Sequence, residues 1–194
     1  MKKKLIFATG NEGKMKEVRE ILADSGYEIL SMKEAGVDLE IVEDGTTFEE
    51  NALIKARAVM EATGELTLAD DSGLEIDAFD GGPGVYSSRY LGEDTPYTEK
   101  NQIILDKMKD VPEQERTARF VCVIAAIFPD GQTYTTRGTM EGIIGYEASG
   151  ENGFGYDPIF YLPELKKYSA QLSSNEKNEL SHRGEALRKM KEVL

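Results

Sequence analysis

The residues best suited to chemistry are two adjacent acids, Asp70 and Asp71, which follow the apolar segment 66–69. In α/β sheets, ligands gather at the carboxyl ends of the strands. Two neighbouring carboxylates there are costly unless their charge is used, and carboxylate oxygens are the ligands that Mg²⁺ prefers. Because successive strand residues point to opposite faces, we expect one Asp to face a ligand and the other to support the loop. An Asx turn formed by Asp71-Ser72-Gly73 is the alternative, and we favour the functional interpretation.

A second acidic pair, Glu43-Asp44, lies just before a predicted helix. A carboxylate that faces a metal ion can also position or deprotonate a water molecule. Glu43 is therefore a candidate for a further metal ligand, although for Glu43 alone a solvated loop acid is the simpler interpretation.

The segment Thr9-Gly10-Asn11-Glu12-Gly13-Lys14 lies between a predicted strand and a predicted helix. Glycines free backbone N–H groups to point at an anion, the helix dipole favours negative charge, and Lys14 adds a full cation. The segment is not a Walker A loop, because it has too few residues between its glycines and Met15 occupies the position of the metal-binding Ser or Thr. It predicts either a phosphate site or an ordinary strand-to-helix turn.

Three basic residues near the carboxyl end of the chain, Lys177, His182 and Arg183, form another candidate group. Ser181 is a good N-cap, which places His182 and Arg183 in the first turn of a helix. Cations there oppose the helix dipole, so their presence indicates a negative or electron-rich ligand nearby. The alternative is a surface cap region that carries basic residues by chance.

The glycine-rich segment Gly153-Phe154-Gly155-Tyr156-Asp157-Pro158 could bind a flat ligand. Its glycines let the backbone come close to such a ligand, and Phe154 or Tyr156 could stack on a base. On pattern alone we slightly prefer a buried aromatic plug in a loop.

The elements that must position these residues follow from hydrophobic periodicity and capping signals. Strands are predicted at 3–8, 28–31, 66–69, 116–128 and 132–142, the last two joined by a turn at Pro129-Asp130-Gly131. Helices are predicted at 14–23, from the capping box Thr47-Phe48-Glu49-Glu50 to about residue 63, at 96–109, and from about Ser181 onward. Alternating strands and helices followed by a hairpin predict an α/β fold with a mixed sheet.

Composition restricts the class of protein. The chain has 194 residues and a formal net charge of −13, which opposes binding of long nucleic acid through a basic surface. No apolar run approaches the roughly 20 residues that span a bilayer, and the apolar stretch from Leu5 to Ala8, which follows three lysines, is too short for a secretory signal, so we expect a cytoplasmic location. The single cysteine, Cys122, lies in an apolar segment and is expected to be a small buried residue.

Taken together, the chain resembles the inosine triphosphate pyrophosphatase family, whose members hydrolyse aberrant purine nucleotides. The resemblance runs nearly end to end, and although each block alone is weak, six in order at family-like spacing are specific. The blocks are Thr9 to Lys14, Thr47 to Ala52 with Lys55 to Arg57, Ala69 to Leu74, Gly82 to Tyr90, Gly153 to Pro158, and Glu176 to Asn178 with Ser181 to Gly184.

The resemblance implies a fold, an assembly and a reaction. The fold would be a single domain over residues 1–194, with two lobes, a long curved mixed sheet and a cleft between the lobes, and the protein would be a homodimer. ITP, dITP or XTP would be hydrolysed to the monophosphate and pyrophosphate, with Mg²⁺ as the cofactor and water attacking the α-phosphorus.

Site residues are also implied by the resemblance. Asp71 would accept the proton and, with Glu43, would bind the metal. The residues expected to hold the triphosphate are Thr9, Gly10, Asn11, Glu12, Gly13 and Lys14. Those expected to contact the rest of the nucleotide are Ser72, Phe154, Gly155, Tyr156, Asp157, Lys177, His182 and Arg183, with the last two near the 6-oxo edge of the purine.

Two other functions remain open at this point. A pyrophosphatase of similar fold could act on modified pyrimidine triphosphates, and a panel of substrates would separate it from a purine enzyme. A nucleotide sensor could bind without turnover, but it would have no need to keep the metal-binding carboxylates.

Overall fold

The computed structural model of the chain describes residues 2–194, which form an α/β fold with a mixed sheet of seven strands. The sheet order is β2-β1-β3-β4-β5-β6-β7, with β1 parallel to β2 and β3, and with β6 antiparallel to β5 and β7. The strands are β1 (Lys4–Phe7), β2 (Glu28–Ser31), β3 (Leu66–Ile76), β4 (Thr117–Ile127), β5 (Thr133–Ile144), β6 (Phe160–Leu162) and β7 (Lys167–Tyr168). The helices are α1 (Glu12–Ile21), α2 (Phe48–Thr63), α3 (Tyr97–Lys107), α4 (Ser174–Leu180) and α5 (His182–Lys191).

The chain divides into two compact units. The first comprises residues 1–71, 122–138 and 182–194, and the second comprises residues 72–121 and 139–181. The long strands β3, β4 and β5 contribute to both units, so the division follows packing and not the order of the chain.

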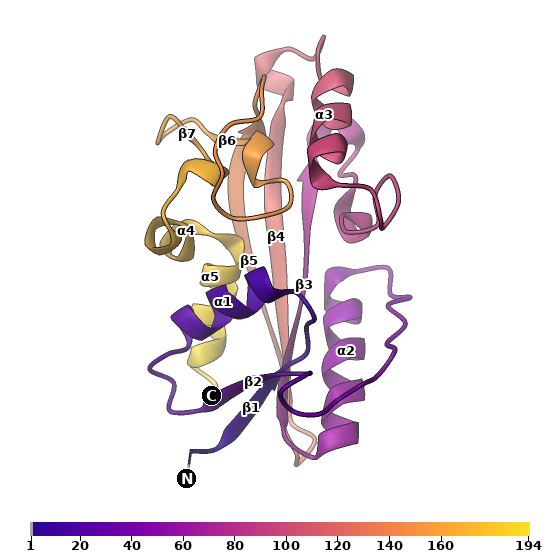
Figure 1. Cartoon of the computed structure of the whole chain (residues 1–194), viewed down its shortest axis with the longest axis vertical. Helices are drawn as coiled ribbons and strands as arrows, with labels where there is room; N and C mark the ends of the chain where they lie inside the picture. Colours follow the sequence, from indigo (N-terminus) through magenta and orange to yellow (C-terminus); the bar gives the residue numbers. More distant parts are fainter. Residues whose placement is uncertain (1) are drawn as a thin grey trace. The chain divides into compact units, whose positions relative to one another are not determined.

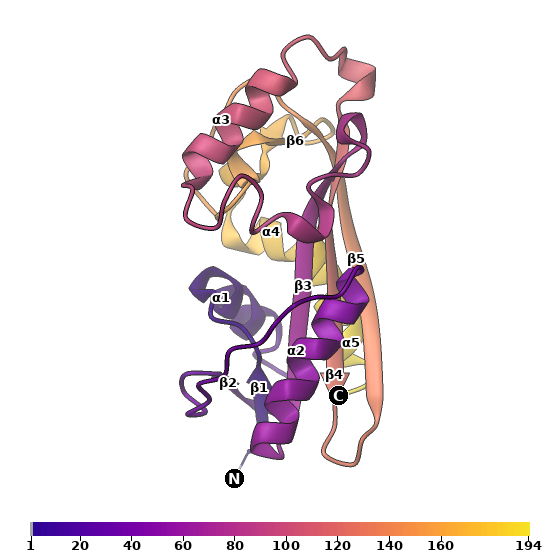
Figure 2. The same ribbon diagram turned by 90° about the vertical axis from the view of Figure 1, so that its right-hand side faces the viewer.

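In the first unit, helices cover both faces of the sheet: α1 and α5 lie on one side of β1 and β3, and α2 lies on the other (Figures 1 and 2). Strand alternation explains this arrangement, because residues of one parity face α1 and α5 and the others face α2. The buried cluster on the α1 and α5 side is Leu5, Phe7, Met15, Val18, Leu22, Leu66, Leu68, Cys122, Ile124, Ala126, Ala186, Leu187 and Met190. Cys122 is thus a buried core residue, as expected.

The second unit has a core of its own. It is built on the remaining lengths of β3, β4 and β5, with α3 and the segment around β6 packed against them. Its members are Leu74, Ile76, Ile104, Leu105, Met108, Ala118, Phe120, Met140, Ile144, Tyr156, Ile159, Phe160, Leu162 and Leu172.

Capping residues set the helix ends that frame the candidate site. Asn11 caps α1 by accepting a hydrogen bond from the Lys14 N–H. Thr47 and Glu50 form the predicted capping box of α2. That helix ends at Gly64, which adopts φ +69° and so provides the left-handed conformation that glycine tolerates best.

Three sequence predictions about the elements need correction. The third strand does not stop at residue 69: β3 continues through both aspartates to Ile76, so no Asx turn follows Ala69. The first helix begins at Glu12 and not at Lys14, because Asn11 supplies the cap. Helix α4, which carries Lys177, was not predicted, because it is only 7 residues long. Among residues 2–194, no helix is both long and apolar enough to cross a membrane.

Candidate active site

The two aspartates lie within β3 and face opposite sides of the sheet. Asp70 has no exposed surface and Asp71 is 8% exposed. Asp70 has the parity of Leu66 and Leu68, which pack toward α1 and α5, whereas Asp71 faces α2. The two carboxylates therefore have different partners on the two faces of the sheet, and the assignment of one of them to a ligand stays a prediction.

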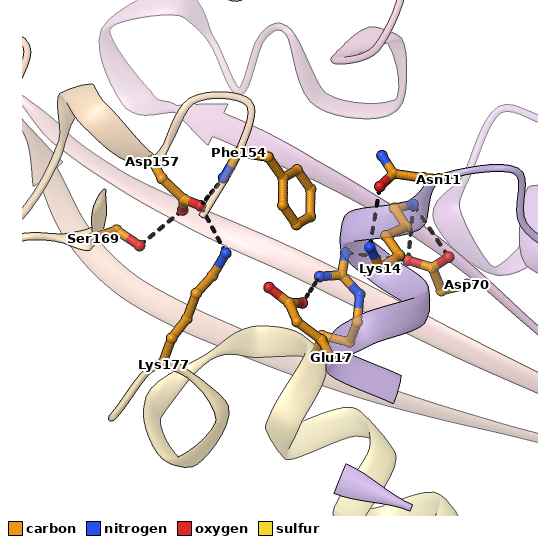
Figure 3. A network of polar contacts seen from close by, with 9 residues as sticks. Asn11, Lys14, Glu17, Asp70, Phe154, Asp157, Ser169 and Lys177 are labelled. Carbon is orange, nitrogen blue, oxygen red and sulfur yellow. Dashed lines mark hydrogen bonds and ion pairs between the residues drawn. The ribbon is translucent and has the colours of Figure 1, made fainter. Parts of the chain in front are cut away.

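Asp70 is the centre of a buried network of charges (Figure 3). Its two carboxylate oxygens lie 3.1 and 2.9 Å from the Lys14 ammonium at the start of α1. The Arg183 guanidinium in the first turn of α5 lies 3.4 Å from Asp70 Oδ2 and forms a second, closer ion pair with Glu17 of α1. These two basic and two acidic groups sum to zero charge. The sequence indicated that a cation in the first turn of α5 has a negative group nearby. Carboxylates of the protein itself, on Glu17 and Asp70, are such groups for Arg183.

The environment of Asp71 shifts its pKa strongly. Burial raises the pKa of its carboxyl to about 6; the ammonium of Lys55 opposes that rise, and the nearby Asp70 and Glu43 carboxylates add to it. Asp71 Oδ2 is buried and accepts no hydrogen bond from any residue in the described part of the chain. A group whose pKa lies near the operating pH can both exist as the base and accept a proton readily.

Glu43 and Asp71 lie around one ammonium group, that of Lys55 in α2. Lys55 Nζ is 2.7 Å from Glu43 Oε1 and 3.8 Å from Asp71 Oδ1. Burial disfavours the charged form of Lys55, but three surrounding carboxylates outweigh that effect and raise its pKa. The loop that carries Glu43 is fixed by a hydrogen bond at Gly45, whose N–H donates to Asn51 Oδ1 at 2.9 Å. A Cβ at position 45 would lie 2.7 Å from that same oxygen, so the loop needs glycine there.

These carboxylates fit a magnesium ion. Within residues 2–194, no group of three or more His, Cys, Asp or Glu side chains gathers as a metal site. Mg²⁺ usually takes only one or two protein carboxylates and completes its shell with waters and substrate phosphates. Two convergent carboxylates, one with a buried oxygen that lacks a partner, match that requirement.

The segment from Thr9 to Lys14 forms the turn between β1 and α1. Thr9 Oγ1 accepts the N–H of Asn11 at 3.1 Å, which shapes the turn. The first N–H groups of a helix have no acceptors within it, so this end of α1 can bind an anion. Gly10, Asn11 and Glu12 are exposed, and Gly13 and Lys14 are partly exposed, so the turn is accessible.

The glycine-rich segment belongs to the second unit, where Asp157 organises it (Figure 3). Asp157 Oδ2 accepts the Phe154 N–H at 3.0 Å and the Lys177 ammonium at 2.7 Å, and its Oδ1 accepts the Ser169 hydroxyl at 2.8 Å. The same ammonium lies 4.6 Å from the centre of the Phe154 ring. Asp157 and Lys177 are thus a buried ion pair that fixes this loop, and Phe154 remains partly exposed.

Tyr156 and Gly155 complete the segment. Tyr156 is 4% exposed and belongs to the core of the second unit, which agrees with the aromatic plug preferred on pattern alone. Gly155 has φ +63°, a conformation that favours glycine. A side-chain contact with a base would therefore come from Phe154 and not from Tyr156.

The predicted residues fall into two groups, one in each unit. The first unit holds the triphosphate turn, Glu43, Asp71, His182 and Arg183, and the second holds Ser72, the glycine-rich segment and Lys177. Sequence reasoning missed Lys55 and Glu17 as members of the charge networks. Lys55 stands in a block shared with the family, and its place two helical turns after the capping box was the available signal. Glu17 lies one turn after Lys14 on α1, but nothing in the sequence pairs it with Arg183.

Comparison with known proteins gives the family. The model of the Ham1 family matches residues 5–193. A dITP/XTP pyrophosphatase of Desulforamulus reducens is 51% identical over 191 residues, covering 98% of this chain and 95% of the relative. A dITP/XTP pyrophosphatase of Bacillus subtilis is 47% identical, covering 99% and 97%. A solved HAM1 protein from Coxiella burnetii is 41% identical with a TM-score of 0.89, covering 98% of both chains. The chain therefore belongs to the Ham1 family.

Proposed function

We propose that this protein is a Mg²⁺-dependent nucleoside-triphosphate pyrophosphatase that converts ITP, dITP and XTP to the monophosphate and pyrophosphate. The observation that carries the proposal is Asp71: it is a buried carboxyl whose pKa is raised to about 6, it has an oxygen without a partner, and Glu43 lies beside it. The names of the close relatives, dITP/XTP pyrophosphatases, agree with this chemistry.

Asp71 acts as the base in the proposed reaction. Water attacks the α-phosphorus, Asp71 accepts a proton from it, and pyrophosphate leaves. With a pKa of about 6, most of the Asp71 population is ionised at neutral pH and able to accept that proton. Asp71 and Glu43 would hold the magnesium ion, which when bound offsets charge on the phosphate oxygens and orients water.

The turn from Thr9 to Lys14 is the proposed site for the triphosphate. The backbone N–H groups of this turn that are not already hydrogen-bonded, together with the positive end of α1, stabilise the phosphates of the substrate and the charge on departing pyrophosphate. Lys14 contributes a point charge, and the Asp70 carboxylate holds its ammonium.

The nucleoside is assigned to the remaining predicted residues. Phe154 is the side chain that can stack on a purine, and the main chain at Gly155 and Tyr156 can approach its edge. Asp157 and Lys177 fix the loop through their ion pair. Ser72, His182 and Arg183 stay as predicted contacts of the nucleotide, and donors among them would favour a 6-oxo group over a 6-amino group.

The proposal includes two further expectations: a homodimer, which comes from the family resemblance, and a cytoplasmic location, which comes from the sequence. Light scattering coupled to size exclusion would give a mass of about twice the 21.5 kDa chain for a dimer.

The test of function is pyrophosphate release from ITP, XTP, dITP, ATP, GTP, dUTP and dTTP, with Mg²⁺ and with EDTA. Fast, EDTA-sensitive turnover of ITP and XTP, with slow turnover of ATP and GTP, is expected. Activity confined to pyrimidine nucleotides would assign the protein to the related pyrimidine enzymes. Tight ITP binding without turnover would make it a sensor.

A further inference from the structure

We propose that Ser87, Tyr156 and Asn101 are positioning residues that hold the glycine-rich segment through two separate hydrogen bonds and so set where Phe154 meets the purine. This inference rests on the proposed function only in taking Phe154 as the contact of the base. It also assigns a role to the block from Gly82 to Tyr90, which the proposed reaction leaves without one.

Ser87 is itself fixed to the strand that precedes it. Its hydroxyl oxygen accepts the N–H of Leu74 in β3 at 2.9 Å and lies 2.6 Å from the carbonyl oxygen of Gly84, to which it donates. Ser87 is 5% exposed, so water does not compete for these bonds. The hydroxyl thus ties the turn after Gly84 to the backbone of β3, and the Ser87 carbonyl becomes a fixed acceptor.

Tyr156 uses that acceptor. Its hydroxyl donates to the Ser87 carbonyl oxygen at 2.5 Å, across 69 residues of sequence. Burial raises the pKa of the phenol, so it stays protonated and remains a donor throughout the neutral range. The ring also meets the edge of Tyr97 in α3, with ring centres 5.1 Å apart.

Asn101 of α3 holds the neighbouring residue. Its side-chain N–H donates to the Gly155 carbonyl oxygen at 3.1 Å. Asn101 is 3% exposed, and its Oδ1 is buried without a partner in residues 2–194. A buried acceptor without a partner is costly, so the stabilising contribution of this amide comes from its N–H donor. Helix α3 and the Ser87 turn therefore hold Gly155 and Tyr156, the two residues that directly follow Phe154.

This arrangement gives Phe154 a defined place without enclosing it. Its own N–H is held by Asp157 at 3.0 Å, while its ring stays partly exposed. Loosening the residues that follow it lets the ring adopt positions that do not stack on a base, and the lost preorganisation appears as weaker binding of the nucleoside.

The test measures binding of inosine monophosphate to the full-length protein by calorimetry, alongside ITP turnover and thermal melting. Tyr156→Phe removes one hydroxyl and keeps the ring. Tyr134→Phe is the matched control, because the Tyr134 hydroxyl makes an exposed hydrogen bond to Gln132. We expect Tyr156→Phe to weaken inosine monophosphate binding about five- to tenfold, with a similar rise in KM for ITP. We expect the kcat and the affinity for inorganic pyrophosphate to stay within about twofold of the wild type.

Asn101→Leu gives an independent reading, because it removes the donor to Gly155 together with the acceptor that lacks a partner. Asn101→Leu is expected to weaken inosine monophosphate binding by a similar factor, including when its melting temperature equals that of the wild type. Wild-type affinity in both variants, or equal losses for inosine monophosphate and pyrophosphate, would overturn the inference, and so would a wild-type protein that does not bind inosine monophosphate. A wild-type protein that fails to hydrolyse ITP would instead refute the proposed function.

Discussion

At the scale of single residues, the surroundings of each buried carboxylate determine the role that we assign to it. Asp70 and Asp71 are neighbours in one strand, yet Asp70 contacts two cations of α1 and α5 while Asp71 keeps an oxygen without a partner. A carboxylate whose pKa is raised to about 6, like that of Asp71, is well suited to accept a proton near neutral pH. The environment therefore separates two chemically identical residues into a structural anchor and a proposed base.

Replacing the base gives the first prediction. Asp71→Asn keeps the shape of the side chain and removes its ability to accept a proton, so we expect kcat for ITP to fall by about 10³-fold or more with a small change in KM. Steady-state pyrophosphate release measures both values. Asp80→Asn is the control, because Asp80 is exposed and has φ +53°, a conformation that Asn tolerates well. Near-normal turnover by Asp71→Asn would remove Asp71 from the mechanism.

The same carboxyl predicts a pH dependence of activity. The base must be ionised, so kcat/KM measured with saturating Mg²⁺ should rise with pH and level off above a pKa at or below about 6. Bound metal favours ionisation, so lowering the Mg²⁺ concentration should shift the midpoint upward. At limiting Mg²⁺, where the pKa stays at about 6, a profile that is flat between about pH 5 and about pH 8 would argue against this base.

The free energy of unfolding should depend on pH in the opposite direction to activity: it should fall as pH rises. A carboxyl whose pKa is raised on folding binds its proton more tightly in the folded state, so the folded state loses stability as pH rises from about 4 to about 6. Above that range the ionised Asp71 costs up to about 3 kcal/mol in the metal-free protein. Asp71→Asn should therefore melt at a higher temperature than the wild type at pH 8 in EDTA. Near pH 4 the two should melt together, and a lower melting temperature for the variant at pH 8 would contradict the pKa shift.

At the scale of elements, loops in the second unit depend on close contacts that only glycine allows. Gly153 has φ +70°, and a Cβ there would lie 2.2 Å from Asp157 Oδ2 and 3.1 Å from Lys177 Nζ. Gly153→Ala must therefore displace a buried ion pair as well as strain the backbone. We expect a loss of stability of about 2–4 kcal/mol and weaker ITP binding.

Chemical denaturation with a parallel KM measurement checks this prediction. Gly131→Ala is the matched control, since Gly131 has φ +88° but nothing within 4 Å of the added Cβ. The control isolates the cost of backbone strain. An equal loss in both variants would show that the contact with the ion pair adds nothing.

Most elements could be predicted from the sequence, because local signals define them. The capping box of Thr47 and the glycine at position 64 placed both ends of α2, and β2 was predicted with its observed bounds. The extension of β3 through Asp70 and Asp71 could not be predicted, because two adjacent acidic residues are typical of the end of a strand. What overrides that local preference is tertiary: cations from α1, α2 and α5 surround the two carboxylates.

The site was predictable to a different extent. Residue types and the family resemblance indicated the acids, the triphosphate turn and the basic residues, but not their pairing. The contacts of Lys14 with Asp70 and of Arg183 with Glu17 join residues 56 and 166 positions apart. Spacing in the sequence carries no information about such distant pairs, which arise only once the sheet brings the helices together.

At the scale of the whole molecule, the dominant property is a net charge of −13. The cations of the candidate site are already matched by carboxylates, as in the neutral group of Lys14, Glu17, Asp70 and Arg183. The excess negative charge is therefore spread over the rest of the molecule, where acidic side chains repel one another in the folded state more than in the expanded chain. The surface ion pairs, which salt weakens, contribute little individually.

This balance predicts that salt stabilises the protein. Raising NaCl from about 20 mM to about 300 mM shortens the Debye length from roughly 20 Å to below 8 Å and screens the long-range repulsion, while the buried pairs are screened much less. We expect the melting temperature to rise by a few degrees at pH 8 in EDTA, and the rise to shrink toward pH 4.5, where protonation removes most of the excess charge. A fall in melting temperature with salt at pH 8 would mean that surface ion pairs outweigh the net charge. A rise of equal size at both pH values would point to a general salt effect on apolar burial and not to repulsion.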